Sequence, residues 1–325
     1  MAPGLGLGNS VTANPASGLF GSTPLLLDTY PNAHRAYSVR KLRTEYTGYA
    51  MKIRVDIGDD GASTTDKTAD VAFDDDGFVS ASSKIYNPSA GGSDGDTLAT
   101  FVGSEDEVYC HTWYDQSGSP VVDATDTGAA TLANQPKLYT SNSLVTDVTG
   151  SGTPRAALLY DSSDKLNITN TGLALNAISV FTSFNITNSA NSAPFTLNYQ
   201  FGSPTRYFFP YLLSNVLYFY HDNQAATSQN LDEDGYGLTI KRRLFSFLCG
   251  TGSQKMVING NTNTAGSPSY ATDSLGGSQT YVSIGHNLLI AGLTGKMQEF
   301  IVYDSDQTSN NAGITSEINT ALEVY

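Results

Sequence analysis

The sequence predicts an all-β protein folded as a sandwich or jelly roll. Charged residues make up only 15% of the 325 residues and aromatic residues make up 10%, while Gly, Ser, Thr and Asn fill much of the remainder. This composition favours strands and turns over helices. The second half of the chain is a series of short apolar segments separated by turn signals such as 259-NGN-261. Strands and turns at this frequency are typical of a sandwich or jelly roll.

The first 28 residues differ in composition from the rest of the chain. They combine Gly, Pro and Ser with isolated apolar residues, which is too broken a pattern for a self-contained helix or strand. We therefore predict an extended anchoring arm over residues 1–28 and one sandwich domain over residues 29–325. The side chains expected to anchor the arm on a partner are Leu5, Leu7, Leu19 and Phe20.

Two helices are expected beside the strands. The first is short and lies within residues 31–48, where apolar residues recur near helical spacing and Gly48 can end the helix. Its expected apolar positions are Ala36, Val39, Leu42 and Tyr46. The second lies within residues 308–325, with Asn310 or Asn311 as its cap and an apolar face made of Ile314, Ile318 and Leu322.

Strands are expected along the whole domain. Strict alternation in residues 50–57 predicts a half-buried strand. The later segments expected to form strands are 178–186, 206–213, 216–221, 243–250, 254–260, 281–285 and 296–304. The acidic stretch between Asp56 and Asp96 does not match the spacing of a calcium-binding loop, so we expect solvated loops there.

Charge and cysteine usage exclude several classes of protein. The net charge of −14, from 17 basic and 31 acidic residues, argues against nucleic-acid binding. No run of about 18 apolar residues occurs and the start lacks a leader pattern, so we expect a protein made in a cytoplasm that does not insert in a membrane. Cys110 and Cys249 are too far apart for metal-binding spacing and are expected to be buried thiols. No cofactor or metal is expected.

The stretch 112-TWYDQSGSP-120 holds the only Trp of the chain and supports two interpretations. Alternation places Trp113 and Tyr114 on opposite faces, with Asp115 turning the chain and Gly118 supplying an unusual backbone angle. In the first interpretation this is a structural corner, pinned by a buried Asp115 that accepts backbone hydrogen bonds. In the second, a sugar ring stacks on an exposed aromatic, and the binding residues are Trp113, Tyr114, Asp115 and Gln116.

A second aromatic group, 207-YFFPYLL-213 with 217-LYFYH-221, is a further candidate surface. Core packing explains such a cluster. However, Tyr218 and Tyr220 share one face of a predicted strand, and exposed tyrosines of this kind contact proteins or glycans. We therefore add them to the candidate carbohydrate-binding residues.

Three motifs carry a resemblance to a known family. AHRAYSVRKLRTEYTGYAMKIRV (33–55), HTWYDQSGSPVVDAT (111–125) with ANQPKL (133–138), and SIGHNLLIAGLTGKMQEFIVYD (283–304) resemble the concanavalin A-like sandwich of the arabinofuranosidase B-type catalytic domain. The motif arrangement is more similar to that of phage virion proteins that share it and finish in a laminin G-like half. The resemblance spans residues from about 30 to 325, and it implies a concanavalin A-like β-sandwich.

The chain departs from the enzyme family at both catalytic carboxylates that the resemblance implies. A retaining glycosidase needs two carboxylates on opposite sides of one glycosidic bond. The family nucleophile is a Glu on a mid-chain strand, but no Glu occurs here between Glu107 and Glu233. The family acid is an Asp just after an Ile–Gly pair, but Ile284 and Gly285 are followed by His286 and Asn287.

We therefore expect a bacteriophage virion protein and not an enzyme. It would be a lectin-like decoration or fibre component on the particle surface, held to other capsid or tail proteins by its N-terminal arm. A homo-oligomer is expected, with a trimer favoured by family analogy, and a host surface glycan is the second expected partner. The alternative is an arabinofuranosidase-like glycoside hydrolase that uses two of Asp115, Asp161, Glu233 and Glu299.

Overall fold

The computed structural model describes most of the chain. The described residues are 24–57, 66–118, 123–125, 134–148, 152–169, 177–187, 192–197, 208–213, 216–221, 229–231, 242–250, 253–263, 281–286 and 292–325. The anchoring residues proposed for the arm, Leu5, Leu7, Leu19 and Phe20, lie outside this set.

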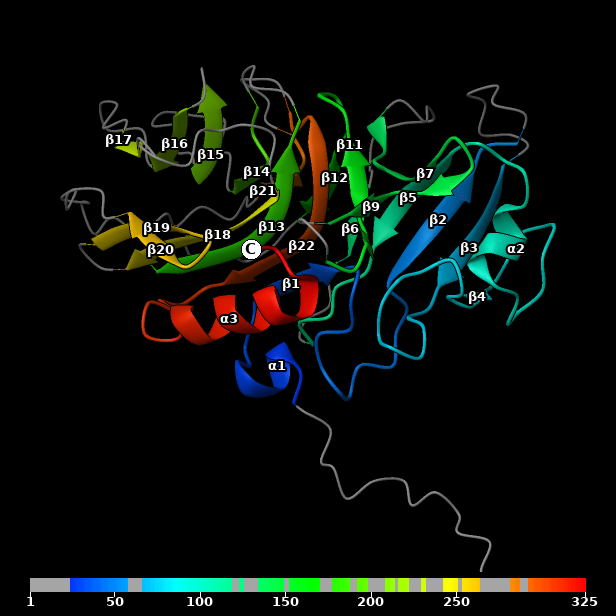
Figure 1. Ribbon diagram of the computed structural model, residues 1–325, viewed down its shortest axis with the longest axis horizontal. Helices are drawn as coiled ribbons and strands as arrows, with labels where there is room; N and C mark the ends of the chain where they lie inside the picture. Colours follow the sequence, from blue (N-terminus) through cyan, green and yellow to red (C-terminus); the bar gives the residue numbers. More distant parts are fainter. Residues whose placement is uncertain are drawn as a thin grey trace, which may run out of the picture.

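A set of antiparallel strands at one end of the molecule is shared by the two sheets of the sandwich (Figure 1). Strands β4 (Ile85–Tyr86), β3 (Lys67–Val71), β2 (Met51–Val55) and β5 (Val108–Trp113) pair in that order. A short helix, α2 (Leu98–Val102), lies beside them and begins at Thr97, whose hydroxyl accepts from Thr100 N. A bulge interrupts the β2–β5 register between Lys52 and Ile53.

The sheet branches at β5. Its last residues pair with β6 (Ala124–Thr125), which leads through β12 (Leu166–Thr169), β21 (Tyr281–Ile284) and β14 (Phe195–Leu197). This first branch continues through β15 (Phe208–Leu213), β16 (Val216–His221) and β17 (Gln229–Leu231). The first residues of β5 pair instead with β7 (Lys137–Thr140), which starts the second branch.

The second branch contains the longest strands. It runs from β7 through β11 (Leu158–Tyr160), β22 (Gly295–Tyr303), β13 (Ile178–Ile186) and β18 (Arg242–Gly250) to β19 (Ser253–Ile258) and β20 (Asn261–Asn263). Strand β1 (Arg35–Ser38) pairs with the C-terminal half of β22. The short strands β8 (Ser143–Leu144), β9 (Thr146–Asp147) and β10 (Arg155–Ala156) complete the fold.

The main core lies between the two branches. Phe195 of the first branch packs against Phe247 and Phe300 of the second, with ring centroids 5.5 and 5.1 Å apart. Cys110 is buried in this core, as expected, and burial raises the pKa of its thiol. The Cys249 side chain lies outside the described residues. Such a core, filled from both sheets, is what makes the architecture a sandwich.

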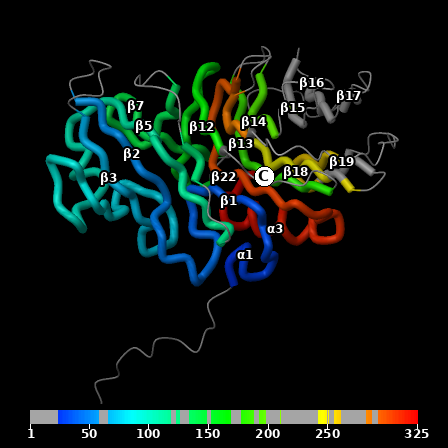
Figure 2. The backbone as a smooth tube through the Cα atoms, turned by 180° about the vertical axis from the view of Figure 1, so that it is seen from behind, coloured from blue at the N-terminus to red at the C-terminus, as the bar shows by residue number. Residues whose placement is uncertain are grey.

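A second core lies under two helices. Helices α1 (Leu26–Thr29) and α3 (Asn311–Leu322) cover the outer face of the second branch, beside β1 and β22 (Figure 2). The expected apolar face of α3, with Ile314, Ile318 and Leu322, is fully buried there. Asn310 stands at the N-cap without a side-chain capping bond. Leu26 and Leu27, which we assigned to the arm, belong to this core, so the folded domain includes them.

The helix predicted within residues 31–48 is wrong. Residues 35–38 form strand β1, followed by an isolated bridge between Arg40 and Phe78, and the short N-proximal helix lies earlier, in α1. Pairing with β22 satisfies the backbone of β1, and all four of its side chains are buried. Burial of both faces of a paired strand outweighs the local preference for a helix that the spacing of apolar residues indicated.

The other predicted helix and strands are confirmed, but strand β2, which was expected to be half-buried, is buried at every residue except Lys52. Strands β13 and β16 have the predicted bounds, and each other predicted segment of the second half contains a strand within two residues of the predicted ends. The solvated loops expected for the acidic stretch are wrong in part, because strands β3 and β4 lie within it and the side chains of Asp56, Asp66 and Asp70 are buried. Asp74, Asp94 and Asp96 instead accept backbone N–H bonds that fix turns.

No helix in the described part of the chain is long and apolar enough to cross a membrane. Within the same residues, no three His, Cys, Asp or Glu side chains gather in a way that could hold a metal ion.

Candidate functional site

The stretch after β5 is a buried corner. Trp113 closes the strand with its ring in the main core, 6.1 Å from the ring of Tyr37, and has no exposed surface. Asp115 and Gln116, which follow, are also fully buried. A sugar could reach any of the three only if the corner opened. The arrangement matches the first interpretation of this stretch and offers no stacking surface at Trp113.

Asp115 ties the corner to strand β1. Its Oδ1 accepts bonds from Ala36 N at 3.0 Å and Ser117 N at 2.9 Å, and its Oδ2 accepts from Ser117 Oγ at 2.9 Å. Arg35 Nη1 lies 4.0 Å from Oδ2, and both side chains are buried. Gly118 follows with φ of +95°, a conformation that favours glycine. The buried carboxylate and the unusual glycine angle predicted from the sequence are confirmed.

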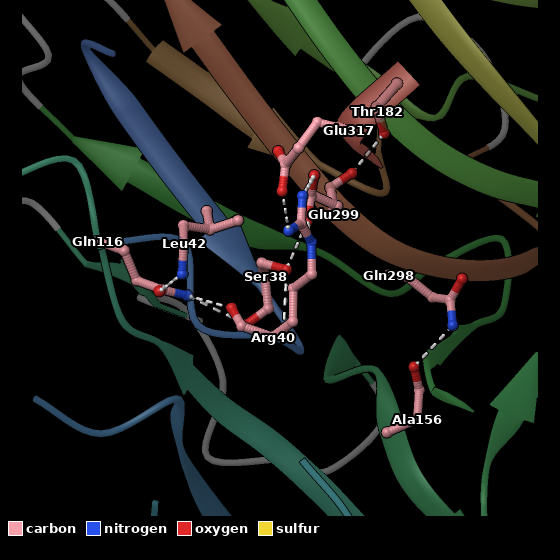
Figure 3. Close-up of polar contacts among 9 residues, drawn as sticks. All are labelled: Ser38, Arg40, Leu42, Gln116, Ala156, Thr182, Gln298, Glu299 and Glu317. Carbon is pink, nitrogen blue, oxygen red and sulfur yellow. Dashed lines mark hydrogen bonds and ion pairs between the residues drawn. The ribbon is translucent and has the colours of Figure 1, made fainter. Parts of the chain in front are cut away.

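Gln116 joins the corner to the segment after β1. Its Oε1 accepts from Leu42 N at 2.8 Å and its Nε2 donates to Arg40 O at 3.0 Å, so one amide satisfies two backbone groups (Figure 3). Its own backbone N–H donates to Ala36 O at 2.7 Å. The Gln116 amide, which the sequence suggested as a partner for a sugar hydroxyl, therefore stabilises the fold.

The same segment supplies a buried ion network. Arg40 Nε donates to Glu299 Oε2 at 2.8 Å, and Arg40 Nη1 donates to Glu317 Oε1 at 3.0 Å (Figure 3). Ser38 Oγ donates to the same Glu299 oxygen at 2.7 Å. Burial raises the pKa of Glu317, while the guanidinium of Arg40 opposes that rise. The network connects α3 to β22 and β1.

Tyr114 is the one residue of the corner that reaches the surface with its side chain. It is half-buried and donates a 2.6 Å hydrogen bond from its hydroxyl to Asp70 Oδ1. Burial, and then this bond, raise the pKa of its phenol above the ordinary range. Asn87 Nδ2 donates to the other oxygen of Asp70 at 2.8 Å. The Tyr114 ring is therefore fixed in one orientation, next to the Asp70 carboxylate and the Asn87 amide.

Four more aromatic rings lie in the same part of the fold as Tyr114. Tyr49 and Tyr86 stack with ring centroids 5.5 Å apart and planes at 28°, and Tyr46 meets Phe73 edge to face at 6.4 Å. The rings are half-buried. Tyr46 and Tyr114 are electrostatically coupled, and Asp70 and Tyr86 are direct cross-strand partners. We call the five residues Tyr46, Tyr49, Phe73, Tyr86 and Tyr114 the tyrosine surface.

The Tyr46 ring packs closely against the backbone at Gly48. Tyr46 donates a hydrogen bond to Tyr49 O at 2.9 Å, so its ring folds back over the intervening residues. A β-carbon at Gly48 would lie 2.5 Å from the Tyr46 hydroxyl oxygen. Gly48, expected from the sequence to end a helix, instead leaves room for this ring.

The arrangement suits carbohydrate recognition. Aromatic faces and adjacent carboxylate and amide groups are the combination that a pyranose ring requires, because its apolar face stacks while its hydroxyls donate and accept hydrogen bonds. Sequence reasoning found Tyr114 and missed the other four rings. The signal available was 46-YTGY-49, with two tyrosines flanking a turn residue.

No protein-family model and no curated protein matches the chain. Among solved structures, a mutant GH54 α-L-arabinofuranosidase soaked with 4-nitrophenyl α-L-arabinofuranoside is similar, with a TM-score of 0.59 and 13% identity. A GH54 α-L-arabinofuranosidase soaked with a cyclic sulfate inhibitor follows, with a TM-score of 0.58 and 12% identity. Each match covers 89% of this chain and 63% of the other.

The chain has a concanavalin A-like β-sandwich fold. In this sandwich, two of the four carboxylates considered for hydrolysis are fully buried, because Asp115 holds the corner and Glu299 holds Arg40. Asp161 is exposed and accepts from Ser163 N in a turn. Glu233 lies outside the described residues.

A buried carboxyl lies beside the Ile284–Gly285 pair. Asp164 is buried, and its carbonyl oxygen would lie 2.9 Å from a β-carbon at Gly285. Burial raises the pKa of the Asp164 carboxyl to about 8, and the hydrogen bond that Asp161 N donates to it opposes that rise. The neighbouring His286 is half-buried, and burial followed by the charge of Lys165 lowers its pKa.

The remaining sequence candidates lie on β16. Tyr218 pairs in register with Tyr211 of β15, and Tyr220 pairs with Phe209. Their side chains are outside the described residues, so their role as a contact surface stays a prediction.

Proposed function

We propose that this protein is a lectin-like structural component of a bacteriophage particle that binds a glycan through the tyrosine surface. It acts in this proposal as a binding protein and not as an enzyme. The observation that carries the glycan-binding part is the group of five half-buried rings beside Asp70, Asn87 and Asp123. The concanavalin A-like fold supports it as a scaffold.

The rigidity of the tyrosine surface supports the proposal. Tyr114 extends from the corner that Asp115 and Gln116 fix, and Tyr86 extends from a strand paired with β3. Hydrogen bonds from Tyr46 and Tyr114 hold two of the rings in one orientation. Because a preorganised site loses little side-chain entropy on binding, even a small surface gains affinity.

Removing the stacked pair of rings is expected to abolish most of the binding. In Tyr49→Ala and Tyr86→Ala variants, glycan affinity should fall about tenfold each, which corresponds to about 1.4 kcal/mol. A glycan array followed by isothermal titration with the best ligand measures this effect. Tyr325→Ala is the matched control, since Tyr325 is 48% exposed and lies at the C-terminus, outside the tyrosine surface. Equal binding by all variants, or no binding by the parent protein, would contradict the proposal.

The particle assignment rests on the WYDQSG-centred motif arrangement shared with phage virion proteins. Within that assignment, the N-terminal arm attaches the protein to other capsid or tail proteins, and the particle-bound form is a homotrimer. The structure limits how far a deletion of the arm can extend. Leu26 and Leu27 are buried in the second core, so a deletion that spares the fold must stop before them.

Deleting residues 1–23 is expected to leave the sandwich folded and to abolish its incorporation into particles. Mass spectrometry of purified particles should detect the full-length protein and not the truncated one. A deletion of residues 1–28 should also lower the melting temperature, because it removes two buried leucines and leaves a cavity under α3. Absence of the full-length protein from particles, or incorporation of the truncated form, would refute the assignment.

The alternative is an arabinofuranosidase-like glycoside hydrolase. The shared fold with GH54 α-L-arabinofuranosidases favours it. The chemistry needs two carboxylates that both reach the sugar, and the burial of Asp115 and Glu299 removes two of the four considered. Release of 4-nitrophenol from 4-nitrophenyl α-L-arabinofuranoside, abolished by Asp161→Asn, would favour the hydrolase.

A further inference from the structure

Two carboxylates flank the tyrosine surface. Asp70 is 8% exposed, stands opposite Tyr86 across strands β3 and β4, and accepts the Tyr114 hydroxyl bond. Asp123 is half-buried and accepts a 3.1 Å bond from Asp115 N. Its charge acts on both Tyr46 and Tyr114. Both carboxylates therefore lie near the Tyr114 phenol.

The charge at this surface is negative. The pKa values of the Tyr46 and Tyr114 phenols are raised, first by burial and then by the carboxylates beside them. The net charge of −14 adds a long-range contribution of the same sign.

None of the ion pairs in the described part of the chain involves Asp70 or Asp123. Lys52 stands opposite Asp70 in the β2–β3 register, but no ion pair joins the two within the described residues. Arg43 donates to Ser117 O in the corner. The cation–π contacts found in the described part of the chain use Phe78, Phe101 and Tyr109, none of which belongs to the tyrosine surface.

We propose that the tyrosine surface selects glycans that carry a protonated amino group, as in a de-N-acetylated amino sugar, over neutral and anionic glycans. This inference rests on the proposed glycan binding and adds the chemical class of the ligand. An ammonium group gains from an aromatic face and from a carboxylate at once. An N-acetyl group gains neither of these charge interactions, and a uronic or sialic acid is repelled by Asp70 and Asp123.

The spacing of the groups supports recognition of an amine on a sugar ring. The hydrogen bond between the Tyr114 hydroxyl and Asp70 places an aromatic ring directly beside a carboxylate. Tyr49 and Tyr86 supply a stacked pair of rings in the same surface. The shape of the sugar and the charge of its amino group are therefore recognised by different residues, and separate substitutions can test the two contributions.

The test compares three tetrasaccharides by isothermal titration with the full-length protein at pH 6. They are a glucosamine tetramer, its fully N-acetylated counterpart and a uronic-acid-containing tetramer. The glucosamine tetramer should bind at least tenfold more tightly than the N-acetylated one, and the acidic tetramer should bind least. In Asp70→Asn and Asp123→Asn variants the preference should shrink to threefold or less, because binding of the glucosamine tetramer weakens more than binding of the N-acetylated one.

The control variant is Asp75→Asn, which removes an equal charge from an exposed loop position outside the tyrosine surface. If it shrinks the preference as much as Asp123→Asn does, attraction by net charge alone explains the result and the inference is overturned. Equal affinity for the glucosamine and N-acetylated tetramers, lost in Tyr86→Ala, would leave the proposed glycan binding intact and refute the amine selectivity. Thermal unfolding of each variant separates lost binding from lost folding, and the two Asp→Asn variants provide independent readings.

Discussion

Replacing Asp115 with alanine is expected to lower the free energy of unfolding by about 3–5 kcal/mol, which is the cost of breaking a buried charge pair from one side. The carboxylate has no exposed surface and lies 4.0 Å from the buried guanidinium of Arg35. It also accepts bonds from two backbone N–H groups, and each buried donor that loses its acceptor costs about 1–3 kcal/mol. Asp115→Asn keeps one acceptor oxygen, so its effect should be smaller.

Urea unfolding followed by tryptophan fluorescence measures this loss well. Trp113 is the only Trp of the chain and lies two residues from the substitution, inside the main core. Asp75→Ala serves as the matched control, because an exposed loop carboxylate should change stability by about 0.5 kcal/mol or less. An Asp115→Ala protein within about 1 kcal/mol of the parent would show that the corner does not hold β1 in place.

Much of the fold was predictable from local pattern, and particular strands show why. Strand β13 and strand β16 have the predicted bounds because each is an unbroken apolar or alternating run between turn residues. The segment of β1 was not predictable in this way. Its apolar residues recur near helical spacing, and only the pairing of Ala36 with Ile301 and its bond to Asp115 decide for a strand.

The candidate site was predictable only in part, for a similar reason. Alternation along β5 correctly separates a buried Trp113 from an outward Tyr114. The partners of Tyr114 come from a loop and from strands up to 68 positions away, such as Tyr46 and Asp70. Nothing in a single sequence states which strands pair or in which register, so the rings of the tyrosine surface could not be gathered before the structure was known.

The Arg40–Glu299 pair should show the second large effect, and it should be strongly non-additive. In Arg40→Met, Glu299 stays fully buried without its cation, and in Glu299→Leu, Arg40 loses its main partner. Each single variant should lose about 3–5 kcal/mol of unfolding free energy. The double variant replaces both charges with apolar groups of similar size, so it should lose clearly less than the sum of the two.

Glu317→Gln provides the comparison within the same network. Its side chain is 29% exposed and bonds a single guanidinium nitrogen of Arg40, whereas Glu299 accepts from two nitrogens of Arg40 and from Ser38 Oγ. Because water reaches Glu317, the loss should be about 1 kcal/mol or less. Urea unfolding of the parent protein, Arg40→Met, Glu299→Leu and the double variant completes the double-mutant cycle. Additive effects of Arg40→Met and Glu299→Leu would mean that the two residues stabilise the fold independently, and the network would not be the link between α3, β22 and β1.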